Sequence, residues 1–320
     1  RDAQESRGLG DVYKRQHKTL MRGQRQSYTS THSTNSRTMN ILGISRGTIY
    51  SPNLASSDAA IFHAVAQKLR ARGHQVECIT EDEMLNHDHS SFQRIYTMAR
   101  DTATIKKLQR NGHSILRSPI LNSLSGIITC TSKGSVASLM LKSHIPQPDF
   151  IYGNSSSVIT SSKKMTDFSF PLWVKNSVSS AITASDTVYC TTKAELDLSL
   201  EDFRQRHIDE WLVQEHVTGD LIKFYGVEGT DFFHWYYASQ GHSKFGLESI
   251  NGKEKGYTFD PLAIKEAVDR FARHIDVPIY GGDAVIDSKG QFRIIDFNDF
   301  PSFSVCRDKA AEAIAERVIN

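Results

Sequence analysis

The chain has 320 residues, of which 39% are hydrophobic and 23% charged, and its formal net charge at pH 7 is +2. This composition predicts a globular protein with a sizeable core and excludes collagen-like, coiled-coil and broadly disordered chains. The positive sign comes from residues 1–38, where eight Lys and Arg residues stand against three acids, so that the remaining 282 residues carry a net charge of −3. Nucleic-acid binding is therefore not expected.

Residues 1–38 are expected to be a disordered or non-native tail. Nine of the 22 residues from His17 to Thr38 are Ser or Thr, and a segment without apolar periodicity cannot bury enough surface to offset its chain entropy. The first stretch, Arg1–Gln16, resembles a translated sequencing adapter. Met39 is the expected start of the native protein, with Met21 as the alternative.

The chain also lacks the sequence signals of export and of membrane insertion. The tail contains no apolar central run of a secretory signal, and no run of about 18 apolar residues occurs anywhere. Four cysteines are scattered without the spacing of a zinc site or a disulfide framework. We therefore expect a cytoplasmic protein with reduced thiols at Cys78, Cys130, Cys190 and Cys306.

Residues 39–125 are expected to form a small parallel α/β domain. A strand at Asn40–Ser45, a helix at Ala55–Arg72 and a strand at Gln75–Thr80 make one βαβ unit, which implies parallel pairing and a right-handed crossover. Three short elements are expected after it, at Arg94–Ala99, Thr102–Asn111 and His113–Leu116.

Two further domains, 126–210 and 211–320, are expected to mix helices with strands. The predicted helices are Lys133–Ser143, Lys193–Arg206, Pro261–Ile275 and Arg307–Val318. The predicted strands are Asp149–Tyr152, Phe170–Lys175, Asp186–Cys190, Trp211–Val217, Leu221–Val227, Phe232–Ala238, Tyr280–Asp287 and Gln291–Phe297, with the last two paired through a turn at residues 288–290.

The last hairpin contains the strongest chemical signal. Asp296 and Asn298 are two residues apart on a strand and share one face, and the hairpin can bring Asp283 opposite them. Carboxylate and amide oxygens on one face suit Mg²⁺ bound to nucleotide phosphates. The prediction depends on register, because a slip of one residue would place the aspartates on opposite faces. The alternative is an ordinary hairpin with acidic ends.

Three lysines and a strand end supply the other candidate groups. Lys175 ends an apolar strand, Lys223 lies within another, and Lys133 begins a helix; each can contact phosphate, or be a solvated surface lysine. The strand that contains residues 214–217 runs into a turn at Asp220. Its backbone edge can bind an adenine and Asp220 can accept a ribose hydroxyl, although a plain strand and turn would look the same.

In this order the segments resemble the ATP-grasp superfamily over roughly Thr129–Asn320, and carboxylate–amine ligases of the RimK and glutathione synthetase type in particular. The resemblance implies a small parallel α/β domain followed by a two-subdomain ATP-grasp fold. It also implies roles for matching positions: Lys133 and Lys175 as ATP-contacting lysines, Gln214, Glu215, His216 and Val217 as the adenine hinge, Asp220 and Lys223 as further nucleotide contacts, and Asp283, Asp296 and Asn298 as magnesium ligands.

The chain departs from the family pattern in three places. The segment Asn176–Ser185, where the family has a glycine-rich lid over the phosphates, contains no glycine. Ser302 stands where glycine is common. No arginine occurs between Asp220 and Thr258, so Arg293 or Arg307 is expected to replace the arginine that clamps an acyl phosphate.

The resemblance implies an enzyme that uses ATP and Mg²⁺ to join a small carboxylate to an amine through an acyl phosphate. Two alternatives remain open: a small-molecule kinase similar to the inositol phosphate kinases of this fold, and a nucleotide-binding module without turnover. Substrate contacts are expected at Gly241–Gly256 and Arg46–Asn53. Neither nucleic-acid nor membrane partners are expected.

Overall fold

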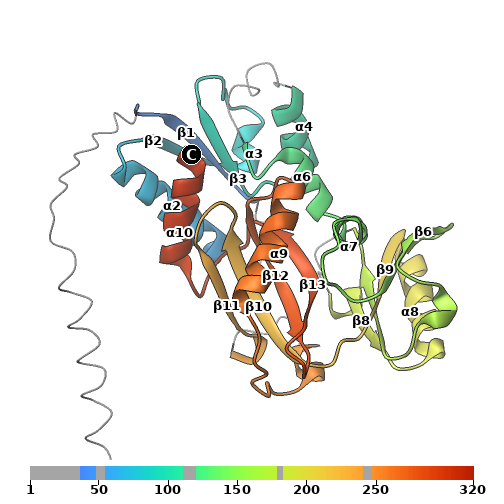
Figure 1. Cartoon of the computed structure of the whole chain (residues 1–320). Helices are drawn as coiled ribbons and strands as arrows, with labels where there is room; N and C mark the ends of the chain where they lie inside the picture. Colours follow the sequence, from blue (N-terminus) through green and yellow to red (C-terminus); the bar gives the residue numbers. More distant parts are fainter. Residues whose placement is uncertain (1–36, 48–54, 111–119, 179–182, 241–246) are drawn as a thin grey trace, which may run out of the picture. The chain divides into compact units, whose positions relative to one another are not determined.

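Three β-sheets organise the chain in a computed structural model that describes residues 37–47, 55–110, 120–178, 183–240 and 247–320. Residues 38–320 form one compact unit. Figure 1 shows a parallel sheet around β1 and β3, a central antiparallel sheet of β10–β13, and a second antiparallel sheet that includes β8 and β9. Among the described helices, none is both long and apolar enough to cross a membrane.

Sheet A is parallel and has the strand order β2-β1-β3-β4. Strands β1 and β3 are buried because both faces of the sheet are covered there, which is usual for parallel sheets, whereas the edge strand β2 is largely exposed. Leu42 and Ile44 of β1 face the core beside α3 and α4, whereas Ile41 faces the core beside α2. The elements are β1 (Asn40–Ser45), α2 (Ala55–Ala71), β2 (Gln75–Thr80), α3 (Glu81–Met84), β3 (Arg94–Thr97), α4 (Thr102–Arg110) and β4 (Ile120–Leu121).

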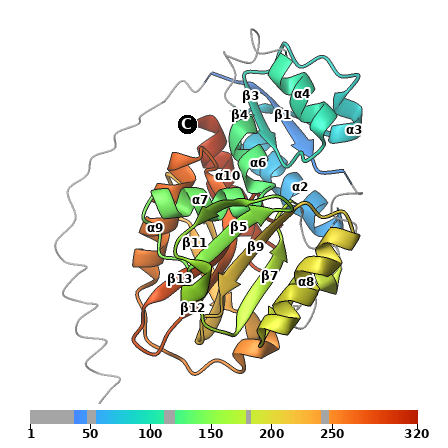
Figure 2. The same cartoon turned by 90° about the vertical axis from the view of Figure 1, so that its right-hand side faces the viewer.

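Sheet B is antiparallel and has the order β6-β5-β9-β7-β8. Leu172 and Val174 lie on the face of β7 toward α8, where they pack on Leu196 and Phe203. Because side chains alternate along a strand, Trp173 and Lys175 lie on the opposite face. Figure 2 shows α8 beside β7. The elements are α7 (Lys133–Lys142), β5 (Phe150–Asn154), β6 (Val158–Ser161), β7 (Leu172–Asn176), β8 (Thr187–Cys190), α8 (Lys193–Gln205) and β9 (Glu210–Glu215).

Sheet C is antiparallel and has the order β11-β10-β12-β13. Ile222 and Phe224 of β10 pack on Val268 and Phe271 of α9, so one face of the sheet is closed by this helix. The alternate residues of β10 and β12 face away from α9. The elements are α6 (Leu124–Cys130), β10 (Asp220–Val227), β11 (Phe233–Tyr237), α9 (Pro261–His274), β12 (Ile279–Ile286), β13 (Phe292–Asp299) and α10 (Arg307–Ile319).

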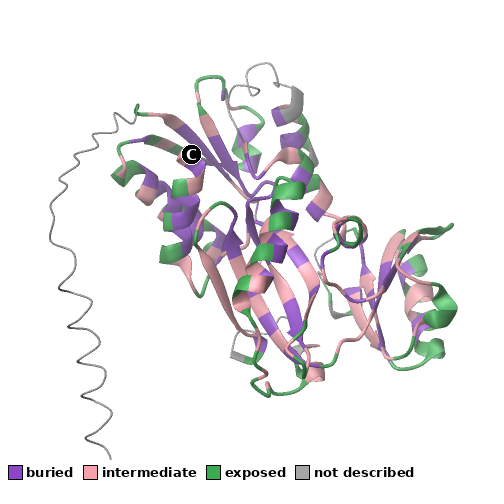
Figure 3. Cartoon of the chain, viewed as in Figure 1, coloured by how far each residue is buried: buried purple, intermediate pink, exposed green. Residues whose placement is uncertain are grey.

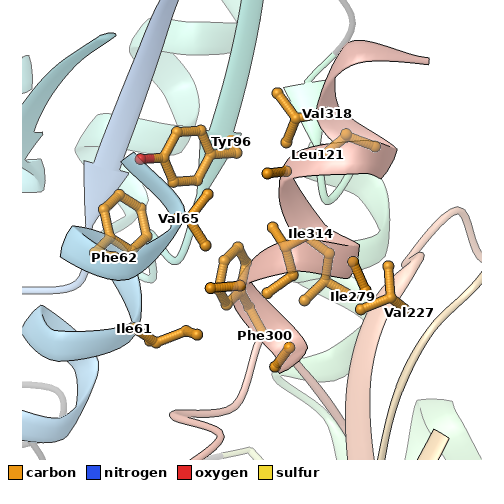
Figure 4. Close-up of a cluster of buried hydrophobic side chains, with 14 of the residues drawn as sticks. Ile61, Phe62, Val65, Tyr96, Leu121, Val227, Ile279, Phe300, Ile314 and Val318 are labelled. Carbon is orange, nitrogen blue, oxygen red and sulfur yellow. The ribbon is translucent and has the colours of Figure 1, made fainter. Parts of the chain in front are cut away.

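One hydrophobic cluster joins sheet A to sheet C. Phe62 of α2 and Tyr96 of β3 stack with ring centroids 4.7 Å apart, and Phe300, which follows β13, packs on Phe62. Ile314 of α10 belongs to the same cluster, which Figure 4 shows between α2, β3 and α10. Figure 3 shows that buried residues continue from sheet A into sheet C. The two sheets therefore share a core.

The predicted fold class is confirmed, since a small parallel α/β unit precedes two antiparallel sheets with their helices. Four of the elements given above, α3, β4, β6 and α6, were not expected. Strand β6 lies in a Ser-rich stretch that reads as a loop, and α6 covers positions 125 and 126, where the sequence suggests a boundary between domains. The expected short element His113–Leu116 lies outside the described residues.

Candidate active site

A cleft of about 470 Å³ lies where the three sheets meet, within the range of small-molecule sites. Sheet B contributes one wall and the uncovered face of sheet C another, and residues that follow strands of sheet A close one side. Its charged lining residues are Arg46, Asp58, Arg100, Lys133, Lys175, Glu215, Lys223, Asp283, Asp296 and Asp299.

A row of charged side chains crosses sheet C within this cleft. Lys223 of β10 pairs in register with Asp283 of β12, which in turn pairs with Asp296 of β13. Residues that are directly opposite each other in antiparallel strands share a face and have Cβ atoms about 5 Å apart. The Nζ atom of Lys223 lies 3.3 Å from an Asp283 carboxylate oxygen. A cation therefore stands beside two adjacent carboxylates.

A β-bulge at Ile295 turns the second carboxylate into the cleft. The register shifts between Asp283 and Ala284, so that Ile295 has no opposite residue. Ile294 and Phe297, three residues apart, both pack in the core beneath the sheet, although residues at odd spacing on a regular strand face opposite ways. Without the bulge, Asp296 would point into that core.

The oxygen ligands expected for magnesium lie together in this cleft. Asn298 lines it and donates a 2.9 Å hydrogen bond from Nδ2 to Asp296 Oδ2. No cluster of three or more His, Cys, Asp or Glu side chains suited to a metal occurs in the described part of the chain. The set of two carboxylates and one amide fits Mg²⁺, which completes its shell with water and phosphate oxygens.

Two more lysines approach the carboxylates from sheet B and its helix α7. Lys175 Nζ donates to Gln214 Oε1 at 2.7 Å and to the carbonyl of the bulged Ile295 at 3.2 Å. Lys133 Nζ lies 3.8 Å from Asp296 Oδ1. Ser177 links the two lysines, because its carbonyl accepts from the Lys133 amide at 2.8 Å and its hydroxyl accepts from Gly134 at 2.9 Å. The start of α7 is thereby tied to the end of β7.

Burial and mutual charge change the pKa values in this group. Burial lowers the pKa of Lys175 to about 8, although Asp296 and Asp283 oppose the change. Burial raises the pKa of Asp283 more than Lys223 lowers it. For Asp296 burial is again the largest influence, but Lys133, Lys175 and the Asn298 hydrogen bond together lower the pKa. The cleft therefore holds its lysine and aspartate charges at a desolvation cost, which is typical of ligand sites.

The strand end expected to form a hinge also lines the cleft. Gln214, Glu215, His216 and Val217 are all lining residues. The His216 ring accepts at Nδ1 a 3.1 Å hydrogen bond from Trp173 Nε1, and burial lowers its pKa. Asn251, which the sequence pattern did not single out, donates from Nδ2 to the Val217 carbonyl at 2.9 Å and lines the same end of the cleft.

Asp220, which was expected to contact a ribose, lies outside the lining of the cleft. It is 2% exposed, and its two carboxylate oxygens accept hydrogen bonds from the backbone amides of Lys255 at 2.7 Å and Tyr257 at 2.9 Å. The carboxylate therefore fastens the segment 255–257 to the start of β10.

The arginines in the cleft are not the two proposed from the sequence. Arg293 donates to the adjacent Phe292 carbonyl, and Arg307 begins α10; neither lines the cleft. Arg46 and Arg100, which follow strands of sheet A, do. Arg46 falls within the Arg46–Asn53 stretch where substrate contacts were expected. The signal for Arg100 was its position just after a parallel strand, where α/β sheets place ligand contacts.

Parts of three expected substrate or phosphate segments lie outside the described residues, namely 48–54, 179–182 and 241–246. The glycine-free lid segment is thus described only at its ends, by residues 176–178 and 183–185. Within Gly241–Gly256, Leu247 and Asn251 line the cleft.

Solved structures with a similar fold include a ligase and a RimK-domain ATP-grasp protein. D-alanine–D-alanine ligase from Bacillus anthracis is similar with a TM-score of 0.57 and 14% sequence identity, over 88% of this chain and 98% of that one. The same enzyme in complex with ATP gives a TM-score of 0.56 at 14% identity and the same coverage. A RimK-domain ATP-grasp protein from Sphaerobacter thermophilus gives 0.58 at 14% identity, over 88% of this chain and all of that one.

The likeness is structural and does not extend to recognisable sequence similarity. Neither a protein-family profile nor the sequence of a curated protein matches the chain. At 14% identity the comparison shows the fold alone. The chain has an ATP-grasp fold.

Proposed function

We propose that this protein is an ATP- and Mg²⁺-dependent ligase that joins a small carboxylate to an amine through an acyl phosphate. The observation that carries the proposal is that three lysines surround two paired aspartates in one cleft. The strand end formed by residues 214–217 lines the same cleft. Lys133, Lys175 and Lys223 come from different elements and meet at Asp283 and Asp296. Such a set of charges suits a nucleoside triphosphate with bound Mg²⁺.

In this proposal the chain positions each part of the nucleotide separately. Residues 214–217 hold the adenine, and the three lysine ammoniums contact the phosphate oxygens. Asp283, Asp296 and Asn298 would hold Mg²⁺, which supplies charge neutralisation at the β- and γ-phosphates when bound. Because the carboxylates already face the lysines, the charged groups need little rearrangement before phosphoryl transfer.

The proposed reaction has two steps, phosphorylation of the acid and attack by the amine. A carboxylate oxygen of the acid attacks the γ-phosphorus, the bond to the β-phosphate oxygen breaks, and ADP leaves. The amine nitrogen then attacks the acyl carbon, inorganic phosphate leaves, and the nitrogen loses a proton to give the amide. The ligase class is preferred because the similar solved structures named by activity are D-alanine–D-alanine ligases, while fold alone does not choose the substrate.

The test is transfer of ¹⁸O from a labelled acid. The full chain is incubated with ATP, Mg²⁺, a pool of ¹⁸O-carboxylates and a pool of amines, and products are read by mass spectrometry. An amide together with ADP and phosphate carrying one ¹⁸O is expected. A phosphate ester with ADP would instead identify a kinase, and bound ATP without ADP would identify a binding module; either result contradicts the ligase.

A further inference from the structure

The carboxyl-terminal edge of sheet A supplies the charged groups on one side of the cleft. Arg46 follows β1 directly, Glu81 follows β2 directly, and Arg100 comes three residues after β3 ends at Thr97. Because these three strands are parallel, their carboxyl ends lie at the same edge of the sheet, where open α/β sheets bind ligands. Two arginines and a glutamate therefore meet at this edge.

Arg46 is a buried cation whose own contacts are long. Its guanidinium is 12% exposed and lies 3.6 Å from Asp58. It donates to the carbonyls of Met98 at 3.4 Å and Phe300 at 3.3 Å. Good hydrogen bonds to oxygen measure about 2.7–3.2 Å, and a guanidinium has five donors. Among the residues described, its partners thus leave Arg46 with poorly satisfied donors inside a cleft.

Arg100 stands near Arg46, and its side chain has one ion-pair partner within the part of the chain that the structure describes. This partner is Asp299, whose side chain is fully buried. Burial lowers the pKa of Arg46 and the neighbouring Arg100 charge lowers it further, whereas the charges of Asp58, Asp299 and Glu81 raise it. Two guanidiniums that repel each other at the edge of a cleft are stabilised by an anion held between them.

Glu81 holds the backbone segments that carry both arginines. It is 1% exposed, and its carboxylate accepts hydrogen bonds from the amides of Arg100 at 2.7 Å and Asp101 at 2.6 Å. The same carboxylate accepts from the amide of Gly47, next to Arg46. One buried side chain therefore sets the distance between the loops after β1 and β3.

We propose that Arg46 and Arg100 form a subsite for a carboxylate of the acid substrate, and that Glu81 is the positioning residue that holds them there. This inference rests on the proposed function and adds a substrate class. The carboxylate that reacts must reach the phosphate between the lysines, so the carboxylate at the arginines is a second one. The acid substrate is therefore a compound with two carboxylates. Arginine suits this role because its planar fork pairs with both oxygens of a carboxylate.

The first test compares diacids with monoacids of matched length. Calorimetry measures binding of succinate and glutarate, and of butyrate and valerate, to the full chain with and without AMP-PNP and Mg²⁺. We expect the diacids to bind at least about tenfold more tightly, since a charge-assisted pair contributes about 1.5–3 kcal/mol, which is about ten- to a hundredfold. Equal affinity for diacids and monoacids would overturn the inference, as would tighter binding of inorganic phosphate than of any diacid.

Variants then assign the effect to the named residues. Arg46→Gln and Arg100→Gln should each remove the preference for diacids and leave the AMP-PNP affinity unchanged. Arg94→Gln is the matched control, because Arg94 begins β3 at the opposite edge of the same sheet, and it should bind like the unmodified chain. If either glutamine variant unfolds, Arg46→Lys and Arg100→Lys keep the charge and should retain part of the preference. Full preference in all folded variants would overturn the assignment.

The role of Glu81 is tested by comparing the affinity for diacids with the affinity for AMP-PNP. Glu81→Gln keeps the size of the side chain but weakens the bonds to three amides, so diacid affinity should fall about tenfold while AMP-PNP affinity is kept. Glu81→Asp should restore part of the loss. Equal loss of both affinities would show a merely structural role. Failure of AMP-PNP to bind the unmodified chain would contradict the proposed function instead, while diacid binding without nucleotide would still report on the arginines.

Discussion

Asp283 and Asp296 face each other across β12 and β13, and they share the cleft face of sheet C because β13 has one extra residue just before Asp296. The bulged Ile295 directs its carbonyl to Lys175, so the residue that creates the carboxylate pair also contacts one of its balancing cations. A local irregularity of the strand thus decides whether Asp296 joins Asp283 on the cleft face of sheet C.

Close contact between β12 and β13 makes Gly282 a test of this arrangement. A Cβ atom at Gly282 would collide with the carbonyl oxygen of Asp296 and approach the Phe224 ring to 2.6 Å. Gly282→Ala should therefore cost about 1–3 kcal/mol of unfolding free energy and reduce AMP-PNP affinity, since the strand that carries Asp296 must shift. Urea denaturation and calorimetry measure the two effects. Unchanged stability and affinity would contradict the close packing.

The low pKa of Lys175 predicts a pH-dependent stability. Its pKa is about 8 in the folded chain and 10.5 ordinarily, so between these values the unfolded chain binds more protons and this group's contribution to stability rises with pH. Lys175→Met should stabilise the unliganded protein at pH 7 by on the order of 2 kcal/mol, with the gap closing as pH rises from 8 to 10.5.

The same substitution should weaken binding of AMP-PNP by more than about tenfold, since it removes a phosphate contact. Lys193→Met, on the exposed surface of α8, is the matched control and should change neither quantity. A destabilised Lys175→Met variant with unaltered nucleotide affinity would show that the ammonium serves folding rather than binding.

Asp220 is expected to act in stability rather than in nucleotide contact. Asp220→Ala removes a buried carboxylate and leaves the amides of Lys255 and Tyr257 without their acceptor, which should cost about 1–3 kcal/mol of unfolding free energy. Nucleotide affinity should change little. Loss of affinity at unchanged thermal stability would restore the ribose contact that the sequence pattern suggests.

The core shared by sheets A and C predicts cooperative unfolding. Ile314 is fully buried in it, so Ile314→Ala should cost about 2–5 kcal/mol and shift a single transition seen by calorimetry. Leu198→Ala, at a position that is 70% exposed on α8, is the control with nearly unchanged stability. A separate transition for sheet A, moved independently of the rest, would contradict the shared core.

Much of the fold could be predicted because its elements have strong local patterns. The βαβ unit of Asn40–Thr80 and the final hairpin follow from apolar periodicity and turn residues, and the structure places them within a residue or two of the expected bounds. Strand β6 was missed because Val158 and Ile159 lie at an exposed sheet edge among serines, where the pattern of a buried strand is absent.

The candidate site was partly predictable for a related reason. Lys175, Lys223 and the aspartates end or interrupt apolar strands, which marks them in the sequence, whereas Arg100 joins the site only through the packing of sheet A on sheet C. The bulge at Ile295 could not be predicted either, because it depends on Ile294 and Phe297 both reaching one core. The hydrogen bonds of Asp220 could not be predicted because its partners, Lys255 and Tyr257, lie 35 and 37 residues away.

The most direct measurement is Mg²⁺-dependent release of ADP from ATP, with the acid and amine pools present, by the full chain and by Asp296→Asn. The variant keeps the shape of the side chain and removes one carboxylate of the pair; Asp231→Asn makes the same change at an exposed position of sheet C's β10–β11 turn. We predict Mg²⁺-dependent ADP release by the unmodified chain and by Asp231→Asn, and at least a hundredfold loss, about 2.7 kcal/mol, in folded Asp296→Asn. Equal rates in all three proteins, or release that does not depend on Mg²⁺, would contradict the account.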